Sequence, residues 1–400
     1  ILNNSGGAYQ CSHFDANSGG VDKSQWTCSP DVFVAKMDPN GIWQWAERVD
    51  HMGQDSAVKL AVTPSGDAYI GGFTGCENLG DDIHGNPIYD GVARFGTHSL
   101  RVCDLSIGSG PSSGAGVPPG YYDQAWQGYV AKINTNGVWQ WVKAIENWDN
   151  EASYVYDVAV DPREPDEVYF TGEIGPCDPY LVQMHSNWSV YTNCPTEQNS
   201  VIGKISQVGA SGLAGSVIID WINYEGVDVT FSEIEAKNAA IFVTGGEHHG
   251  AGSSYQHSFG TTSSVQNGDV FITKLDDGGT YEWTRSCQNG GILEMAASSN
   301  NIAMEVVPGT QCGQLNNVYH GFQIVTLDSS GNWLWSTGDT FDSSSSNLPM
   351  TLQWAAYDST VYNTGATDEV PGVLEFDSNG DVVSVRSFGK MMKIGGSTIL

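Results

Sequence analysis

Residues 35–45 read AKMDPNGIWQW, and residues 131–141, which lie 96 positions later, read AKINTNGVWQW. Each copy contains two alternating apolar segments on either side of a short turn with glycine, which is the pattern of two strands joined by a hairpin. Related hairpins occupy 269–283 and 321–335, and degenerate copies occupy 200–216 and 371–384. The hairpin is therefore a repeated unit that occurs six times.

A second pair of strands lies between most copies of this hairpin. These pairs occupy 60–75, 157–175, 234–246 and 352–367, with a weaker pair at 293–307. Enrichment in Val, Ile, Phe, Tyr and Trp favours strands, and no long segment has a helical period. Four strands repeated six times predict an all-β fold. We expect a six-bladed β-propeller of four-stranded antiparallel blades, because a thin blade must stack on its neighbours to bury both faces.

The hairpin turns begin with Asp or Asn, and glycine follows three residues later. An Asp side chain at the first position accepts hydrogen bonds from the backbone of the turn, and glycine adopts the left-handed conformation. The turn residues predicted in this way are Asp38, Gly41, Gly137, Asp276, Gly279, Asp328, Gly331, Asp377 and Gly380.

Tryptophan follows four of these glycines by four residues, a spacing that places both residues on the same face of a strand. We expect these residues to wedge between adjacent blades: Trp45, Trp141, Trp283 and Trp335. The degenerate copies have Ser216 and Ser384 at this position, which predicts weaker packing there. The alternative is that the Trp-x-Trp pairs form a platform for a ligand.

The repeats predict a single propeller domain over residues 1–400. The predicted blades are 1–50 with 390–400, 55–147, 152–223, 226–287, 290–338 and 349–388. The chain begins inside a blade, because residues 1–8 resemble the second strand of another unit at 361–368. We expect the tail at 390–400 to complete the first blade and close the ring. Alternatively, the tail fills the gap in a neighbouring copy and builds a polymer.

The chain has 400 residues and a formal net charge of −30. A field of this sign repels nucleic acid and anionic lipid, and no apolar stretch has the length of a membrane span. Neither nucleic-acid binding nor membrane insertion is therefore expected. The charge fits a soluble extracellular surface or cation binding. Because the chain opens with Ile1, we expect a processed product whose targeting segment has been removed.

The eight cysteines fall into near pairs and form no CxxC motif. Closing a short loop costs the least entropy, so the expected disulfides join neighbours. These pairs are Cys11 with Cys28, Cys76 with Cys103, Cys177 with Cys194, and Cys287 with Cys312. Disulfides predict an oxidising, extracellular compartment. Three of the pairs lie within long loops on one face of the predicted ring, where they either shape a functional surface or resist proteolysis.

Those loops also contain most of the histidines. A transition-metal site could use His248, His249 and His257 beside Glu247, although solvated loop histidines are the simpler interpretation. Calcium is the other candidate cofactor, because Asp81–Asp82 and Asp276–Asp277 are dense in carboxylates.

Two sequences of the form Asn-x-Ser/Thr provide glycosylation candidates, at Asn3 and Asn187. The zinc-protease motif HExxH and the Walker phosphate-loop motif are missing from the sequence. The sequence therefore identifies no catalytic residue.

The segment FVAKMDPNGIWQWAERV with the later AVTPSGDAYIGGFTG resembles the SBBP-type β-propeller repeat of secreted bacterial and archaeal surface proteins. In that family an acidic turn with glycine precedes a Trp strand, and a GxxYxxGxT-like strand follows. The resemblance covers most of the chain in six copies, two of them poor. It implies an extracellular, often cell-surface or adhesive setting, without shared catalytic residues.

We therefore expect a non-catalytic secreted structural or interaction protein of a cell surface or an extracellular assembly, such as a filament. Its expected partners are further copies of the chain, an extracellular partner or a glycan. One alternative is a carbohydrate-binding propeller, a lectin or adhesin. Another is a sialidase-like glycoside hydrolase, although sialidases have a turn of the form SxDxGxxW and the spacing here is DxxGxxxW.

Overall fold

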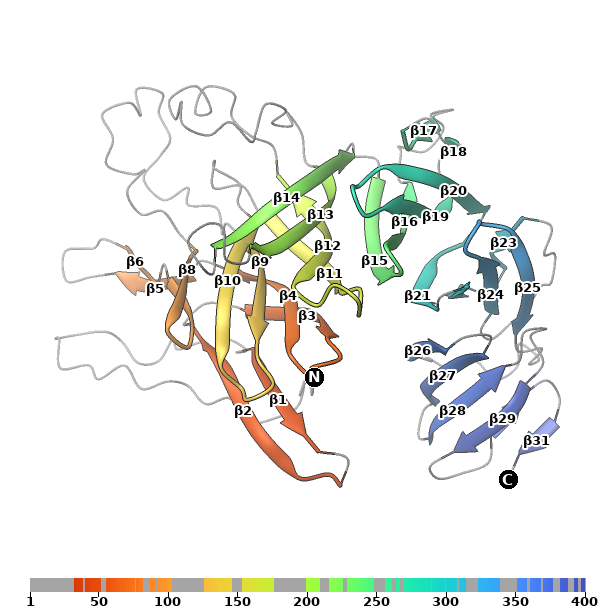
Figure 1. Cartoon of the computed structure of the whole chain (residues 1–400), viewed down its shortest axis with the longest axis horizontal. Helices are drawn as coiled ribbons and strands as arrows, with labels where there is room; N and C mark the ends of the chain where they lie inside the picture. Colours follow the sequence, from red (N-terminus) through yellow and green to blue (C-terminus); the bar gives the residue numbers. More distant parts are fainter. Residues whose placement is uncertain are drawn as a thin grey trace. The chain divides into compact units, whose positions relative to one another are not determined.

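The structure is a computed structural model. It describes residues 32–38, 40–51, 55–75, 77–81, 87–90, 92–102, 126–145, 153–175, 199–208, 216–225, 229–247, 256–260, 264–266, 269–288, 290–298, 300–307, 309–313, 323–338, 351–357, 360–367, 370–376, 382–387, 392–394 and 397–399. Every element of regular secondary structure in these ranges is a β-strand (Figure 1), which confirms the all-β prediction. None of these residues forms a helix with the length and hydropathy needed to cross a bilayer.

The chain forms two compact units, Ile1–Ala159 with Pro165–Asp220, and Val160–Glu164 with Trp221–Leu400. In the first unit, one sheet has the order β1 (Phe33–Met37), β2 (Trp43–Asp50), β7 (Val92–Phe95) and β8 (His98–Arg101). The next has the order β10 (Trp139–Ile145), β9 (Trp126–Ile133), β4 (Ala68–Gly75) and β3 (Asp55–Val62). A small sheet pairs β5 (Glu77–Asp81) with β6 (Pro87–Asp90).

The third four-stranded sheet contains β11 (Ser153–Ala159), β12 (Glu167–Ile174), β13 (Asn199–Val208) and β14 (Ser216–Glu225). The division between the two units falls within β14, after Asp220. This sheet is formed by strands that are consecutive in the sequence, as the four-strand repeat predicts.

The second unit contains three further large sheets (Figure 1). The first is β15 (Val229–Lys237), β16 (Ala240–Glu247), β19 (Val270–Asp276), β20 (Tyr281–Gln288) and β23 (Gln311–Cys312). The others are β21 (Ile292–Ala297), β22 (Asn301–Val306), β24 (Gln323–Asp328) and β25 (Trp333–Gly338), and β26 (Thr351–Tyr357), β27 (Thr360–Thr367), β28 (Val370–Phe376) and β29 (Val382–Ser387). A hairpin of β17 (Gln256–Ser258) and β18 (Ser264–Gln266) lies in the connection between β16 and β19.

The first sheet includes two strands from outside the blade predicted at 1–50 with 390–400. β2 pairs with β7 through Val49–Phe95 and Asp50–Arg94, and β7 and β8 belong to the long connection between β4 and β9. The tail forms β30 (Met392–Ile394) and β31 (Ser397–Ile399), which pair with each other. The intervening Gly-Gly sequence favours such a hairpin. Any contact of the tail with residues 1–31 lies outside the described part of the chain.

Alternating apolar side chains of these strands form the cores. In the first unit the largest members are aromatic, and Phe95 and Tyr129 pack edge to face at 5.0 Å. In the second unit the core combines Phe242, Ile272, Met304 and Leu327 with a buried cystine. Because alternate residues of a strand point to opposite faces of its sheet, the alternating apolar residues of the sequence line the buried faces.

Three sheets carry a bulge at the same place in their first strand, in β3, β11 and β15. The neighbouring strand has glycine opposite each bulge. A Cβ at Gly72, Gly172 or Gly245 would lie 2.0, 2.1 or 2.2 Å from the carbonyl oxygen of Ser56, Tyr154 or Thr230. The bulged carbonyl thus leaves no room for a side chain.

Candidate functional site

Hairpin turns of the repeat use the side chain of their first residue as a hydrogen-bond acceptor. Oδ1 of Asp38 accepts from the backbone N–H groups of Asn40 and Ile42, each at 2.9 Å. Asn134 and Asp328 form both equivalent bonds, and Oδ1 of Asp276 accepts from the backbone N–H of Thr280 at 2.8 Å. The following glycines, Gly41, Gly137, Gly279 and Gly331, have φ between 80° and 83°. This combination fixes each turn in one left-handed conformation.

In the first unit, the tryptophan of one sheet docks on the turn of the next. Nε1 of Trp45 donates to the carbonyl oxygen of Thr135 at 3.0 Å. A Cβ at Gly137 would lie 2.8 Å from Cδ2 of Trp45, so the indole rests directly on the glycine. Nζ of Lys36 donates to the same carbonyl at 3.1 Å. The turn therefore presents both a polar and a flat apolar contact to its neighbour.

The second unit repeats this arrangement between β20 and the turn after β24. Nε1 of Trp283 donates to the carbonyl oxygen of Ser329 at 3.2 Å, and a Cβ at Gly331 would lie 2.9 Å from Cδ2 of the indole. Nε of Arg285 donates to the carbonyl oxygen of Gly331 at 2.7 Å. The residue two positions after Trp thus adds a second hydrogen bond to the same turn.

Trp221 makes the third contact of this kind, and the sequence prediction missed it. Its Nε1 donates to the carbonyl oxygen of Asp277 at 3.0 Å, and Asn223 donates to that of Gly279 at 2.7 Å. The prediction placed Ser216 at this position, but Ser216 is the first residue of β14. Asn223 follows Trp221 at the same two-residue spacing at which Arg285 follows Trp283, and aligning the two tryptophans would have given the correct register.

The remaining predicted packing residues are placed as follows. Trp141 is buried, and its ring lies 5.7 Å from that of Tyr69, centroid to centroid. Trp335 lies in β25 and Ser384 in β29, but their side chains are outside the described part. Asp377 and Gly380 also fall outside it.

A buried polar cluster lies where the chain leads from β2 into β3. Nδ1 of His51 lies 2.9 Å from Oδ1 of Asp55, and Oγ1 of Thr74 hydrogen-bonds to both groups. The side chains of His51 and Asp55 are fully buried. In a catalytic triad the two ring nitrogens face different partners, whereas here Nδ1 faces both. The cluster therefore links the connection between β2 and β3 to strands β3 and β4 by hydrogen bonds.

A second polar cluster lies in the second unit at the end of β14. The Glu225 carboxylate accepts a hydrogen bond from the Tyr281 hydroxyl at 2.6 Å and lies 2.7 Å from Nε2 of His257. Phe259 packs against both rings. Burial raises the pKa of Tyr281, and the negative charge of Glu225 raises it further. Tyr281 therefore stays protonated and donates, which is the opposite of what a nucleophile needs.

The candidate metal and glycan positions are described only in part. His257 pairs with Glu225, and no group of three metal-ligating side chains in the described ranges includes it. His248 and His249 lie outside these ranges, as do Asn3 and Asn187. Of the calcium candidates, Asp276 is used in its hairpin turn, whereas the side chains of Asp81 and Asp82 are not described.

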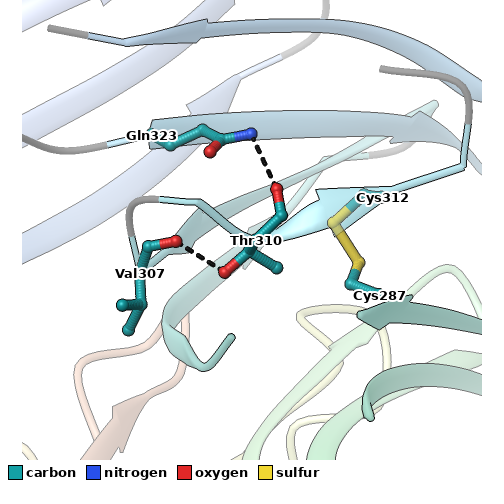
Figure 2. The surroundings of a disulfide bond; sticks show 5 residues. All are labelled: Cys287, Val307, Thr310, Cys312 and Gln323. Carbon is teal, nitrogen blue, oxygen red and sulfur yellow. Dashed lines mark hydrogen bonds between the residues drawn. A yellow bond between two sulfur atoms is a disulfide. The ribbon is translucent and has the colours of Figure 1, made fainter. Parts of the chain in front are cut away.

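One of the expected disulfides lies in the described part and joins Cys287 of β20 to Cys312 of β23 (Figure 2). Both cysteines are fully buried. Oγ1 of Thr310 donates to the carbonyl oxygen of Val307, and Nε2 of Gln323 donates to that of Thr310 at 3.3 Å (Figure 2). The cystine therefore holds a short, internally bonded segment against β20. The other six cysteines lie outside the described ranges.

No family model matches the chain, and no curated protein matches it. Solved structures with partial likeness include an apocarotenoid oxygenase of Synechocystis, with 8% identity, a TM-score of 0.38, and coverage of 88% of this chain and 67% of that one. An acylaminoacyl peptidase of Pyrococcus horikoshii has 10% identity, a TM-score of 0.38 and coverage of 84% and 46%. The endosialidase of phage phi92 has 10% identity, a TM-score of 0.31 and coverage of 84% and 49%. Such low TM-scores carry no argument about this chain.

Proposed function

We propose that this chain is a non-catalytic, secreted structural or interaction protein, built as a six-bladed β-propeller of the SBBP-repeat type. It would act at a cell surface or in an extracellular assembly. The observation that carries the proposal is the repeated contact in which an indole N–H donates to the second residue of an acidic or amide turn, at Trp45, Trp221 and Trp283. A contact that recurs from unit to unit is typical of repeat proteins whose stability comes from neighbouring repeats.

The use of the polar groups supports a structural role. His51 and Asp55 are buried together, and Glu225 is occupied by two neighbours. These groups hold strands and connections together, and each would have to break its contacts to act on a substrate. The six sheets of four or five strands in the described part support the six-blade count, and ring closure is included in the proposal.

The extracellular part of the proposal rests on the buried Cys287–Cys312 bond and the charge of −30. Structural disulfides persist in oxidising compartments, and a large net charge keeps an exposed protein soluble. We also propose calcium as a bound ion, because carboxylates dominate the charged residues.

The test combines imaging with an activity screen on the full chain. Electron microscopy is expected to show a closed ring of six blades, and sizing with calcium or with a chelator is expected to reveal any ion-dependent assembly. A panel of chromogenic glycosides is expected to give no turnover. Specific turnover would overturn the non-catalytic proposal, an open or differently numbered ring would overturn the propeller, and strictly monomeric particles in every condition would remove self-assembly.

A further inference from the structure

Four aromatic side chains meet in the first unit, where β4 ends and where β9 and β11 begin. They are Phe73, Trp126, Tyr154 and Tyr156, and each is partly exposed. The ring of Phe73 lies edge to face against those of Trp126 and Tyr154, with centroids 5.2 and 5.1 Å apart. The rings of Tyr154 and Tyr156 are nearly parallel, at 11°, with 6.1 Å between centroids. We call this continuous row of four rings the aromatic shelf.

Close packing and hydrogen bonds hold the shelf in place. A Cβ at Gly75 would lie 2.7 Å from Cζ3 of Trp126, so the indole rests on the bare backbone of β4. Nε2 of Gln127 donates to the carbonyl oxygen of Ile145 at 2.9 Å and to Oγ of Ser153 at 3.1 Å. The second of these bonds joins β9 to the first residue of β11. The rings are therefore positioned before a ligand arrives, which lowers the entropic cost of binding.

The two tyrosines are not required by the fold. The bulges of β3, β11 and β15 place the carbonyl oxygen of Ser56, Tyr154 or Thr230 against a glycine. The bulged residue is Tyr156 in β11 and Val58 in β3. A bulge changes the direction of a side chain and is often found next to a functional site. Because the other two strands form their bulges without tyrosine, the aromatic pair of β11 needs an explanation other than folding.

Polar groups flank the rings of the shelf. The hydroxyl of Tyr156 donates to Oε2 of Glu173, which lies opposite Tyr154 in the pairing of β11 with β12. Burial raises the pKa of Tyr154, and the charge of Glu173 raises it further, so this hydroxyl stays protonated and can donate. Among the described residues, Oε1 of Glu173, the Tyr154 hydroxyl and Nε1 of Trp126 have no hydrogen-bond partner. The shelf therefore offers one acceptor and two donors beside its partly exposed rings.

These groups match the chemistry of a neutral sugar. A pyranose has an apolar C–H face that packs on aromatic rings, and hydroxyls at its rim that both donate and accept. An anionic ligand is disfavoured by the Glu173 carboxylate and by the formal net charge of −30. An aromatic cage for a cation needs a space between its rings, within about 6 Å of each centroid. Phe73 instead contacts both of its neighbours directly, which leaves no such space.

We propose that the aromatic shelf binds a neutral hexopyranose residue of an extracellular glycan. The C–H face of the sugar lies on the parallel rings of Tyr154 and Tyr156, and Oε1 of Glu173 accepts a hydrogen bond from a hydroxyl at its rim. The Tyr154 hydroxyl and Nε1 of Trp126 donate to sugar oxygens. This site deepens the proposed interaction role, and it rests on that role in one respect, namely that the sugar is held and not cleaved.

Saturation-transfer NMR on the full chain tests the choice of ligand. The probes are neutral trisaccharides of glucose, mannose or galactose, each added up to about 10 mM, a range that detects weak binding. Sialyllactose and choline, added in the same way, test an anionic and a cationic ligand. We expect at least one neutral trisaccharide to bind, with the strongest transfer to the C–H protons of one sugar residue. We expect neither charged probe to bind.

Variants of the shelf test its location. Tyr154→Ala removes a ring and is expected to raise the Kd of the trisaccharide about tenfold, whereas Tyr154→Phe keeps the ring and is expected to raise it only about threefold. Glu173→Gln removes the charge and is expected to raise the Kd about fivefold. The matched control is Trp43→Ala, because Trp43 is an aromatic residue of the same unit that is 53% exposed and lies outside the shelf. It is expected to leave the Kd unchanged, and unchanged hydrogen exchange in β9 and β12 would show that each variant is folded.

Three results would overturn the site. Failure of every neutral trisaccharide to bind would remove the sugar and leave the non-catalytic propeller proposal in place. Binding of choline alone would make the shelf a cation site. An equal Kd for the original chain, Tyr154→Ala and Glu173→Gln would place the sugar elsewhere. By contrast, binding that depends on Tyr154 and is accompanied by release of shorter sugars would confirm the shelf and overturn the non-catalytic function.

Discussion

At the residue scale, the first position of the repeated turn shows how one side chain decides a local structure. Oδ1 of Asp328 accepts the backbone N–H groups of Ser330 and Asn332 at 2.9 and 2.8 Å. Asp328→Ala leaves these amides to water and is expected to destabilise the protein by about 1–2 kcal/mol. Asp328→Asn keeps the acceptor, as Asn134 does in another turn, and is expected to cost much less. Denaturant unfolding of both variants checks this, and equal losses would contradict it.

The same carboxylate predicts a dependence on pH. Burial alone would raise the pKa of Asp328, but hydrogen bonds from Asn332 and Ser330 and the charge of Arg285 lower it below its ordinary value of 3.8. Because the unfolded chain then takes up a proton more readily, the stabilisation is present above the unfolded pKa and is lost as the pH falls through the folded pKa. The difference in unfolding free energy between the original chain and Asp328→Asn should shrink from pH 6 toward about pH 2.5. A constant difference would contradict the assignment.

The glycines opposite the bulges have no room for a side chain, so replacing one of them by alanine should destabilise the protein. A Cβ at Gly172 would lie 2.1 Å from the carbonyl oxygen of Tyr154, so Gly172→Ala must displace backbone. We expect a loss of about 2–4 kcal/mol of unfolding free energy. At Gly278 the nearest atom to an added Cβ is Oδ1 of Asp276, at 3.4 Å, so Gly278→Ala is the matched control and is expected to be nearly neutral. Chemical denaturation of both variants measures the two losses of unfolding free energy. Equal losses would show that replacing any glycine is destabilising and would contradict a specific effect of the bulge.

At the scale of elements, the contact between an indole and a neighbouring turn joins one sheet to the next. Trp283→Phe keeps an aromatic ring but loses the donor to Ser329, and is expected to cost about 1 kcal/mol. Trp283→Ala also removes the ring from Gly331 and is expected to cost about 3 kcal/mol. Hydrogen exchange should show the loss in β24 and β25 and leave β9 and β10 unchanged. Equal effects in both places would contradict a local contact.

Strands and turns were predictable from the sequence because their causes are local. Alternation and the Asp-x-x-Gly spacing predict hairpins such as β19–β20 around Asp276, and the turn has the expected bonds. Pairings between distant segments were not predictable. β7 pairs with β2 through only two residue pairs, which leave no periodic signature in either segment. Trp221 was missed because the degenerate copy carries extra residues before its second strand, so a fixed spacing from glycine points to Ser216.

The candidate clusters were less predictable than the strands. His257 was interpreted as a possible metal ligand from its neighbours in sequence, but its partner in the structure is Glu225, 32 residues away. His51 and Asp55 carried no motif, and their partner Thr74 lies on the next strand. Burial and pairing of polar side chains depend on which strands become neighbours, and a single sequence does not state this.

For the whole molecule, the two compact units provide a way to locate the effect of the disulfide. Cys287 and Cys312 are 25 residues apart, and a loop of this length is stabilised by about 3 kcal/mol when it is closed. Replacing both by Ser should therefore lower the unfolding free energy reported by hydrogen exchange in β19, β20 and β24 of the second unit, while the first-unit strands β9 and β11 keep theirs. The control is Gln288→Ala with Gln311→Ala, the adjacent cross-strand pair, whose side chains are exposed. Because this control keeps the covalent bond, it is expected to change little. Destabilisation that extends equally to both units would show that they unfold as one body.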